Sequence, residues 1–86
     1  MGSVKIFWKS NCSKCPPVKS VGRILEEEGI KVVSFDLDTV DGLAEGAYYS
    51  VMATPTMIIE DEEYNRIADF RGTVPTAQEV QKLINQ

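Results

Sequence analysis

The most reactive side chains in this sequence are two cysteines, Cys12 and Cys15, which lie three positions apart near the start of the chain. They are the only cysteines among 86 residues, and the chain contains no histidine. A pair at this spacing can form a structural disulfide, supply part of a metal site, or carry out thiol–disulfide exchange. The neighbouring residues help to distinguish these three chemistries.

Two of the three fit the sequence less well. A disulfide across three residues closes a very short loop, so it restricts the unfolded chain little. The N-terminal residues also lack the basic and apolar pattern of a secretory signal, which would indicate an oxidising compartment. A closed zinc site uses about four cysteine or histidine ligands, whereas this chain offers two. We therefore expect no metal, and a dithiol metal-binding carrier module is the alternative of another functional class.

The redox interpretation depends on where the pair lies. The segment Val4–Trp8 predicts a buried strand directly before the cysteines. Apolar residues at helical spacing follow and predict a helix from about Cys15 to Glu28. The N-terminus of a helix favours a thiolate. We expect Cys12, just outside the first turn, to attack a substrate disulfide, and Cys15, on the buried face, to resolve the mixed disulfide. Basic residues gather around the pair: Lys9, Lys14, Lys19 and Arg23.

The remaining elements must hold this loop in place. Their patterns predict the order β-α-β-α-β-β-α in one domain that spans residues 1–86. Further strands are expected at 32–37, 56–59 and about 64–70, the last as an edge or bulged strand. A second helix follows the apolar repeat from Leu43 to Val51, with Asp41 as its N-cap, and a third begins at the capping box Thr76–Glu79. The first βαβ unit requires a parallel pair, so we predict a mixed four-stranded sheet with helices on both faces.

Several of these segments together resemble the thioredoxin superfamily over the whole chain. The similarity lies in Phe7-Trp8 ahead of the Cys12-Ser13-Lys14-Cys15 motif, in Thr54-Pro55-Thr56 and in Gly72. The resemblance implies a three-layer α/β/α fold of sheet order 2-1-3-4 with strand 3 antiparallel, and a cis Pro55 that faces Cys12. It also implies a substrate-binding groove formed by Trp8, Asn11, Ser13, Lys14, Thr54, Pro55 and Gly72.

The chain departs from the thioredoxin pattern at three places. Ile6 stands where thioredoxins carry a buried acid, Asn11 replaces a tryptophan, and Ser13-Lys14 replaces Gly-Pro. Lys9 is similar to a lysine that glutaredoxins use near glutathione. However, the sequence after Arg71 lacks the glutaredoxin Gly-Gly-x-x-Asp motif. A glutathione-dependent glutaredoxin is therefore the alternative enzyme.

Composition and charge narrow the choice of partners. A net charge of −4 argues against nucleic acid, which requires a basic surface. No apolar run approaches the ~20 residues of a membrane span. We expect a cytoplasmic monomer that reduces disulfide-containing proteins and needs no cofactor beyond its redox-active Cys12–Cys15 disulfide. By resemblance, a thioredoxin-reductase-type electron donor would recharge it.

Overall fold

Seven elements follow one another in the predicted order in the computed structural model, which describes residues 2–85. They are β1 (Ser3–Trp8), α1 (Cys15–Glu27), β2 (Lys31–Asp36), α2 (Val40–Tyr48), β3 (Thr56–Glu60), β4 (Arg66–Arg71) and α3 (Ala77–Ile84). Within these residues no helix has the length and apolar character needed to cross a membrane.

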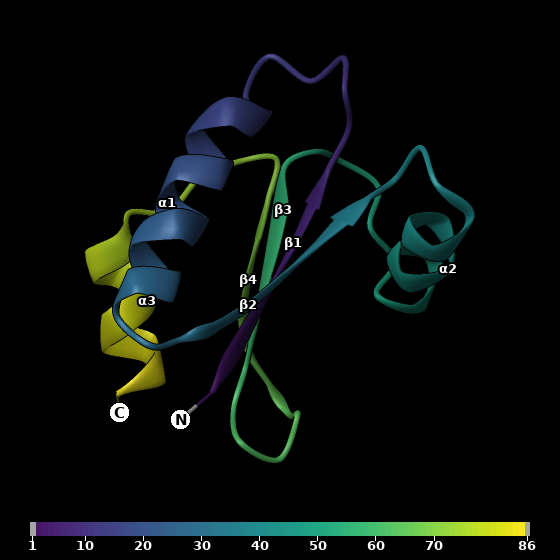
Figure 1. Ribbon diagram of the computed structural model, residues 1–86. Helices are drawn as coiled ribbons and strands as arrows, with labels where there is room; N and C mark the ends of the chain where they lie inside the picture. Colours follow the sequence, from purple (N-terminus) through teal and green to yellow (C-terminus); the bar gives the residue numbers. More distant parts are fainter. Residues whose placement is uncertain (1, 86) are drawn as a thin grey trace.

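The four strands form one mixed sheet in the order β2-β1-β3-β4 (Figure 1). Strand β1 pairs in parallel with β2 and antiparallel with β3, and β3 pairs antiparallel with β4. This confirms the expected sheet order. Strand β4 lies at an edge, and its register with β3 shifts at Ile59/Glu60, so it is both an edge strand and irregular, as its poor alternation indicated.

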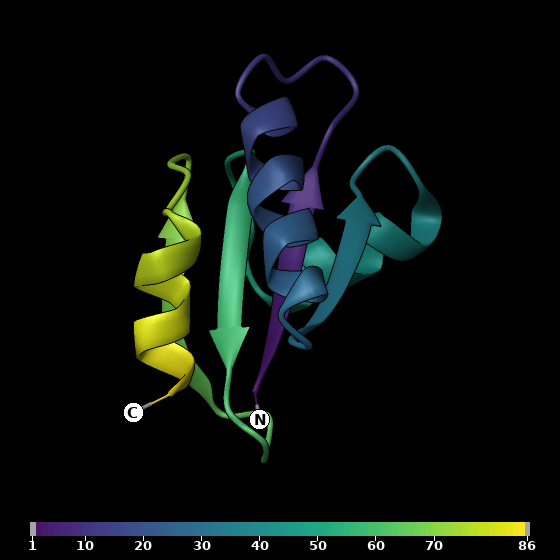
Figure 2. The ribbon, with the colours of Figure 1, turned by 60° about the vertical axis from the view of Figure 1, so that its left-hand side comes forward.

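Helices cover both faces of the sheet. Helices α1 and α3 lie together on one face, and α2 lies on the other (Figures 1 and 2). Because side chains alternate along a strand, Val4 and Ile6 of β1 enter the larger core under α1 and α3, whereas Phe7 enters a smaller core under α2. Each such fully buried side chain contributes roughly 1.5–3 kcal/mol to folding. Both cores therefore fix β1, the strand that leads into the cysteine loop.

Helix α1 begins at Cys15, although two prolines follow at once. Pro16 and Pro17 occupy the first turn, where backbone N–H groups have no helical partner and their loss costs little. The N-cap residue Lys14 makes no side-chain capping bond. Gly29, with φ of 85°, ends the helix in the left-handed conformation that glycine adopts readily. The prolines therefore do not displace Cys15 from the first helical position.

Helix α2 differs from the sequence prediction in its N-cap. Thr39, in an extended conformation, accepts a hydrogen bond through Oγ1 from the backbone N–H of Gly42 at 3.0 Å. The prediction of Asp41 as N-cap was therefore wrong. Asp41 lies in the first turn instead, where a carboxylate is favoured by the helix dipole.

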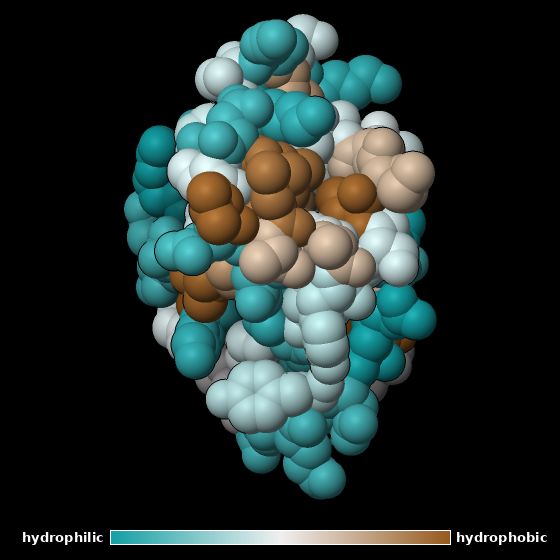
Figure 3. All heavy atoms as spheres, turned by 90° about the vertical axis from the view of Figure 1, so that its right-hand side faces the viewer, coloured by the Kyte–Doolittle hydropathy of each residue, from teal (hydrophilic) through white to brown (hydrophobic). Residues whose placement is uncertain are grey.

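The apolar repeat predicted this helix but does not mark its buried face. Gly42 and Gly46 are buried against the sheet, whereas Leu43 is 57% exposed and Tyr48 is 80% exposed. Figure 3 shows apolar side chains gathered on the surface at this side of the molecule. The reason is close approach: a Cβ on Gly42 would overlap the carbonyl oxygen of Asp36.

The remaining boundaries differ from the predictions by up to three residues, since α2 ends at Tyr48 although the apolar repeat continues to Val51. Strand β4 begins at Arg66 rather than near Tyr64, because Tyr64 lies in the turn of the β3–β4 hairpin with a positive φ of 64°. The predicted capping box of α3 is present. Thr76 Oγ1 accepts from the backbone N–H of Glu79, and the Glu79 carboxylate accepts from the backbone N–H of Thr76.

Candidate active site around Cys12 and Cys15

The two cysteines are joined as a disulfide in the loop between β1 and α1, with their Cα atoms 5.3 Å apart. The loop turns tightly: the N–H of Cys12 donates to the carbonyl of Lys9 at 3.3 Å, and the N–H of Cys15 donates to that of Cys12 at 3.2 Å. Cys15 is the first residue of α1, so both sulfurs lie at the N-terminal end of this helix. Free N–H groups and the helix dipole there favour a thiolate when the disulfide is reduced.

The two sulfur-bearing residues differ in burial, as the sequence predicted. Cys15 is only 2% exposed and lies on the buried face of α1 with Val18 and Leu25. Cys12 is half-buried. A partner can therefore reach Cys12 more easily than Cys15.

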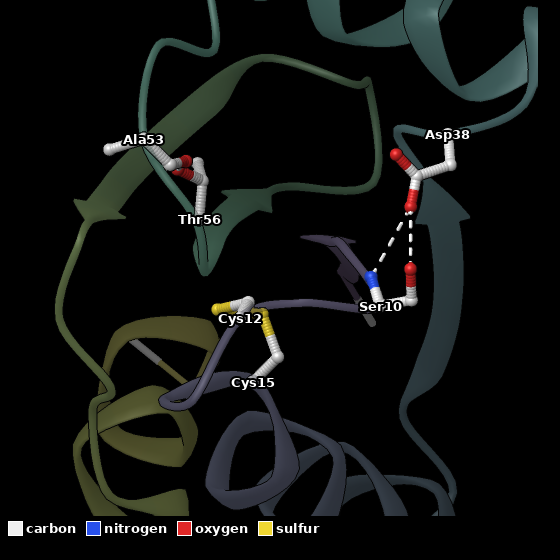
Figure 4. Close-up of a disulfide and its surroundings, with 6 residues drawn as sticks. All are labelled: Ser10, Cys12, Cys15, Asp38, Ala53 and Thr56. Atoms are coloured by element: carbon white, nitrogen blue, oxygen red, sulfur yellow. Dashed lines mark hydrogen bonds between the residues drawn. A yellow bond between two sulfur atoms is a disulfide. The ribbon is translucent and has the colours of Figure 1, made fainter.

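The segment before β3 lies opposite the disulfide in Figure 4, which labels Ala53 and Thr56. The Thr54–Pro55 peptide bond is cis, the isomer that the resemblance implied, and Pro55 is buried. Thr56 Oγ1 donates to the carbonyl of Ala53 at 2.7 Å. The carbonyl of Pro55 accepts from the N–H of Gly72 at 2.8 Å. These bonds fix the chain on both sides of Thr54.

Gly72 belongs to this arrangement because of its backbone. Its φ of 76° lies in the left-handed region, where other residues are strained. A Cβ there would meet Ala53 Cβ at 3.7 Å, an ordinary contact distance. The backbone conformation, rather than lack of space, therefore favours glycine at this position.

Trp8 lies half-buried at the end of β1, and its indole face is covered by Lys19. The Lys19 ammonium lies 3.6 Å from the ring centroid, a cation–π contact. The other predicted loop residues, Asn11, Ser13 and Lys14, are exposed beside the disulfide. Trp8 therefore forms part of the packing beside the loop and ties α1 to β1.

Asp38, which the sequence analysis did not single out, is bonded to the loop that carries the cysteines. Its Oδ2 accepts from the Ser10 hydroxyl at 2.9 Å and from the Ser10 N–H at 3.3 Å (Figure 4). These two bonds hold the pKa of the Asp38 carboxyl below its usual value, and the bond from the hydroxyl has the larger effect. A signal was available. Asp38 follows β2, and the carboxyl ends of the parallel strands β1 and β2 meet at one edge of the sheet.

A small cavity of about 100 Å³ lies beside the segment that precedes β3. It is lined by Lys9, Leu37, Val51, Met52, Ala53 and Thr54. Met52 is 93% exposed at its rim, and Lys9 is also exposed. Within residues 2–85, no cluster of three or more cysteine and carboxylate side chains is arranged to hold a metal ion.

Comparison with known proteins gives one consistent family. The family model described as "Thioredoxin domain" matches residues 2–85. A probable thioredoxin of Archaeoglobus fulgidus is 29% identical over 63 residues, which is 72% of this chain and 69% of that protein.

Solved structures of thioredoxins share the fold. Thioredoxin 1 of Thermosipho africanus superposes with a TM-score of 0.75 at 24% identity over 96% of this chain and 90% of its own. A thioredoxin of Thermus thermophilus gives 0.71 at 22% identity over 95% and 70%.

Proposed function

Because this chain belongs to the thioredoxin domain family and carries a Cys-x-x-Cys disulfide, it is a thiol–disulfide oxidoreductase, and we propose that its role is to reduce disulfide bonds in proteins. The observation that carries the proposal is the difference in burial between the two cysteines at the start of α1. An accessible thiol is suited to attack a partner, and a sheltered one is suited to resolve the product. We propose further that the protein acts as a cytoplasmic monomer.

The reaction conserves atoms and electrons in two steps. The Cys12 thiolate attacks one sulfur of a protein disulfide, so that a mixed disulfide forms and the other substrate sulfur leaves as a thiolate. The Cys15 thiol then loses its proton and attacks Cys12 Sγ, which releases the second substrate thiolate. Two electrons have passed to the substrate, and the chain is left with the Cys12–Cys15 disulfide. A thiol-reducing donor protein must return two electrons before the next turnover.

The segment at Thr54 offers a way to hold an extended substrate. The hydrogen bonds of Ala53 and Pro55 hold this backbone in place, and the segment lies opposite the disulfide in Figure 4. Exposed backbone groups on such a segment can pair with an extended peptide as a further strand does. The substrate would then present its disulfide to Cys12 in a fixed orientation, which lowers the entropy cost of reaction.

Electron supply separates this proposal from the glutaredoxin alternative. A glutathione amino group would need a carboxylate near the start of α3, where Pro75 and Thr76 offer none. The nearest one, Glu79, is engaged by the N–H and hydroxyl of Thr76. We expect the protein to reduce insulin disulfides with dithiothreitol and to accept electrons from a thioredoxin-reductase-type donor. Rapid glutathione-dependent turnover of a small mixed disulfide would instead support a glutaredoxin. Stoichiometric zinc or iron that survives dialysis would support the metal carrier.

Substitution of each cysteine tests the assigned roles. We expect Cys15→Ser to accumulate a stable mixed disulfide with a protein substrate, because the resolving thiol is gone. Cys12→Ser should form none. In the reduced wild type, iodoacetamide at neutral pH should modify Cys12 first, which peptide mass mapping detects. Equal or earlier modification of Cys15 would contradict the assignment.

A further inference from the structure

Arg71, the last residue of β4, connects that strand to the end of helix α2. Its Nη1 donates to the carbonyl of Ser50 at 2.9 Å, and its Nη2 donates to the carbonyl of Tyr49 at 3.0 Å. Its Nε donates to Asp69 Oδ2 at 2.9 Å, which orients the guanidinium plane. All three guanidinium nitrogens are therefore engaged, two of them on backbone atoms that lie more than twenty positions earlier in the chain.

The two carbonyls belong to the end of α2, where helix carbonyls have no partner in the next turn. The helix dipole makes this end negative, so a cation is favoured there. Ser50 follows the C-cap residue Tyr49 and has a φ of 55°, a left-handed conformation that costs a non-glycine residue on the order of 1 kcal/mol. The contacts of Arg71 hold the chain in this conformation.

The residues that follow Ser50 lead directly to the groove. Val51 donates its N–H to the carbonyl of Gly46 at 2.8 Å, and four residues later Pro55 accepts from Gly72. Arg71 and Gly72 are consecutive. Arg71 therefore holds the start of the 50–55 segment, and Gly72 holds its end. Between these two anchors lies Thr54, in the segment between Ala53 and Thr56 that lies opposite the disulfide in Figure 4.

We propose that Arg71 is a positioning residue for the groove wall at Thr54, which it sets by fixing the end of α2. This inference rests on the proposed function, because it concerns how a protein substrate is held. A protein disulfide needs both Cys12 and an ordered Thr54 backbone. A small aromatic disulfide such as 5,5′-dithiobis(2-nitrobenzoate) needs only an accessible Cys12 thiolate. Loss of the Arg71 hydrogen bonds to Tyr49 and Ser50 should therefore affect the reduction of these two substrates differently.

The test compares Arg71→Gln with Arg66→Gln. Both changes remove one positive charge from β4, but among residues 2–85 the Arg66 side chain makes only a 3.6 Å ion pair with Asp69. For insulin reduction we expect Arg71→Gln to raise KM roughly tenfold, in line with the loss of charge-assisted hydrogen bonds, with kcat within about twofold. Its rate with the small disulfide should stay at the wild-type value. Arg71→Lys keeps the charge and part of the hydrogen bonding, so its KM for insulin should lie between that of Arg71→Gln and that of Arg66→Gln.

Two outcomes would overturn the inference. One is an Arg71→Gln variant whose insulin KM equals that of Arg66→Gln. The other is an equal loss of rate with both substrates, which a general structural role would give.

Failure of the proposed function is a separate result, seen as a wild type that does not reduce insulin at all. In that case hydrogen exchange still decides the inference. The amides of residues 51–54 should exchange faster in Arg71→Gln than in Arg66→Gln, while those of α3 are unchanged, and equal exchange would contradict it.

Discussion

Ile6 is almost fully buried between α1 and the sheet, at the position where the thioredoxin resemblance implies an acidic side chain. Its Cδ1 would lie only 2.8 Å from a Cβ on Gly22, so the side chain fills the space under α1 closely. An aliphatic side chain cannot accept a proton from Cys15. Proton loss from the resolving thiol must then use water, the leaving sulfur or another group of the site.

Ile6→Asp should restore a titrating group at the cost of stability. We expect the free energy of unfolding at neutral pH to fall by roughly 2–5 kcal/mol, because core packing is lost and a poorly solvated carboxylate is buried. Burial raises the pKa of such a carboxyl, so the resolution rate should gain a new step above about pH 5. Urea unfolding and stopped-flow kinetics measure the two effects. A carboxyl step already present in the wild type would show that another acid serves the site.

The lowered pKa of Asp38 predicts the sign of a pH dependence in the stability of the loop. The Ser10 hydroxyl and amide bonds hold its folded-state pKa below the usual 3.8. The stabilisation is therefore present above that usual value and is lost as the pH falls through the lower, folded-state pKa. The wild type should be more stable than Asp38→Ala at pH 6, and the difference should shrink towards pH 2. Urea unfolding at several pH values measures this, and a difference that stays constant with pH would contradict it.

At the scale of elements, the sequence predicted where α2 lies but not which face it buries. Apolar periodicity normally marks the inner face of a helix, and here Leu43 and Tyr48 point outward. Glycine carries almost no hydropathy signal. Sequence patterns therefore could not show that Gly42 and Gly46 form the contact face. By contrast, α1 and α3 were predicted well, because large apolar residues such as Val18 and Val80 occupy their buried faces.

We expect Gly42→Ala to destabilise the protein, whereas the same substitution in an exposed helix is usually stabilising. Gly→Ala in an open helix stabilises it by up to about 1 kcal/mol. Here the new methyl group would overlap the carbonyl of Asp36, so we expect a loss of roughly 2 kcal/mol or more. Leu43→Ala, the neighbouring control, should cost about 1 kcal/mol or less, since that side chain is largely exposed. Thermal unfolding distinguishes them, and the reverse order would mean that the glycine face is not the packed one.

At the scale of the whole molecule, a network of polar side chains lies on the face of the sheet that α2 covers. It consists of Lys5, Tyr49 and Glu60. Tyr49 accepts a hydrogen bond from Lys5 at 2.6 Å and donates one to Glu60 Oε2 at 2.8 Å. Burial disfavours the Lys5 ammonium, but Tyr49 and the charges of Glu60 and Glu45 outweigh this and raise its pKa. The group borders a cavity of about 470 Å³. Strand periodicity gave no sign of it, because hydropathy patterns do not identify the partner of a buried charge.

Removing one member of this network should cost more than removing both charges. Lys5→Met leaves the Glu60 carboxylate, whose side chain is 3% exposed, without its cation. We expect a loss of roughly 3 kcal/mol or more for such a broken buried pair. The double variant Lys5→Met, Glu60→Met should regain much of it, because no charge then stays buried. A double-mutant cycle from urea unfolding measures the coupling, and simple additivity would contradict it.

The central place of β1 also has a consequence for how the chain reaches its native state. The first strand in sequence pairs on one side with β2, about thirty residues later, and on the other with β3, more than fifty residues later. Contacts between such distant residues slow folding, because long loops must close before the contacts form. In a nascent chain that ends at α2, the backbone edge of β1 that pairs with β3 would have no partner. The apolar side chains of β1 would also be incompletely covered. Such an edge is prone to aggregation, so stable folding during synthesis has to wait for β3.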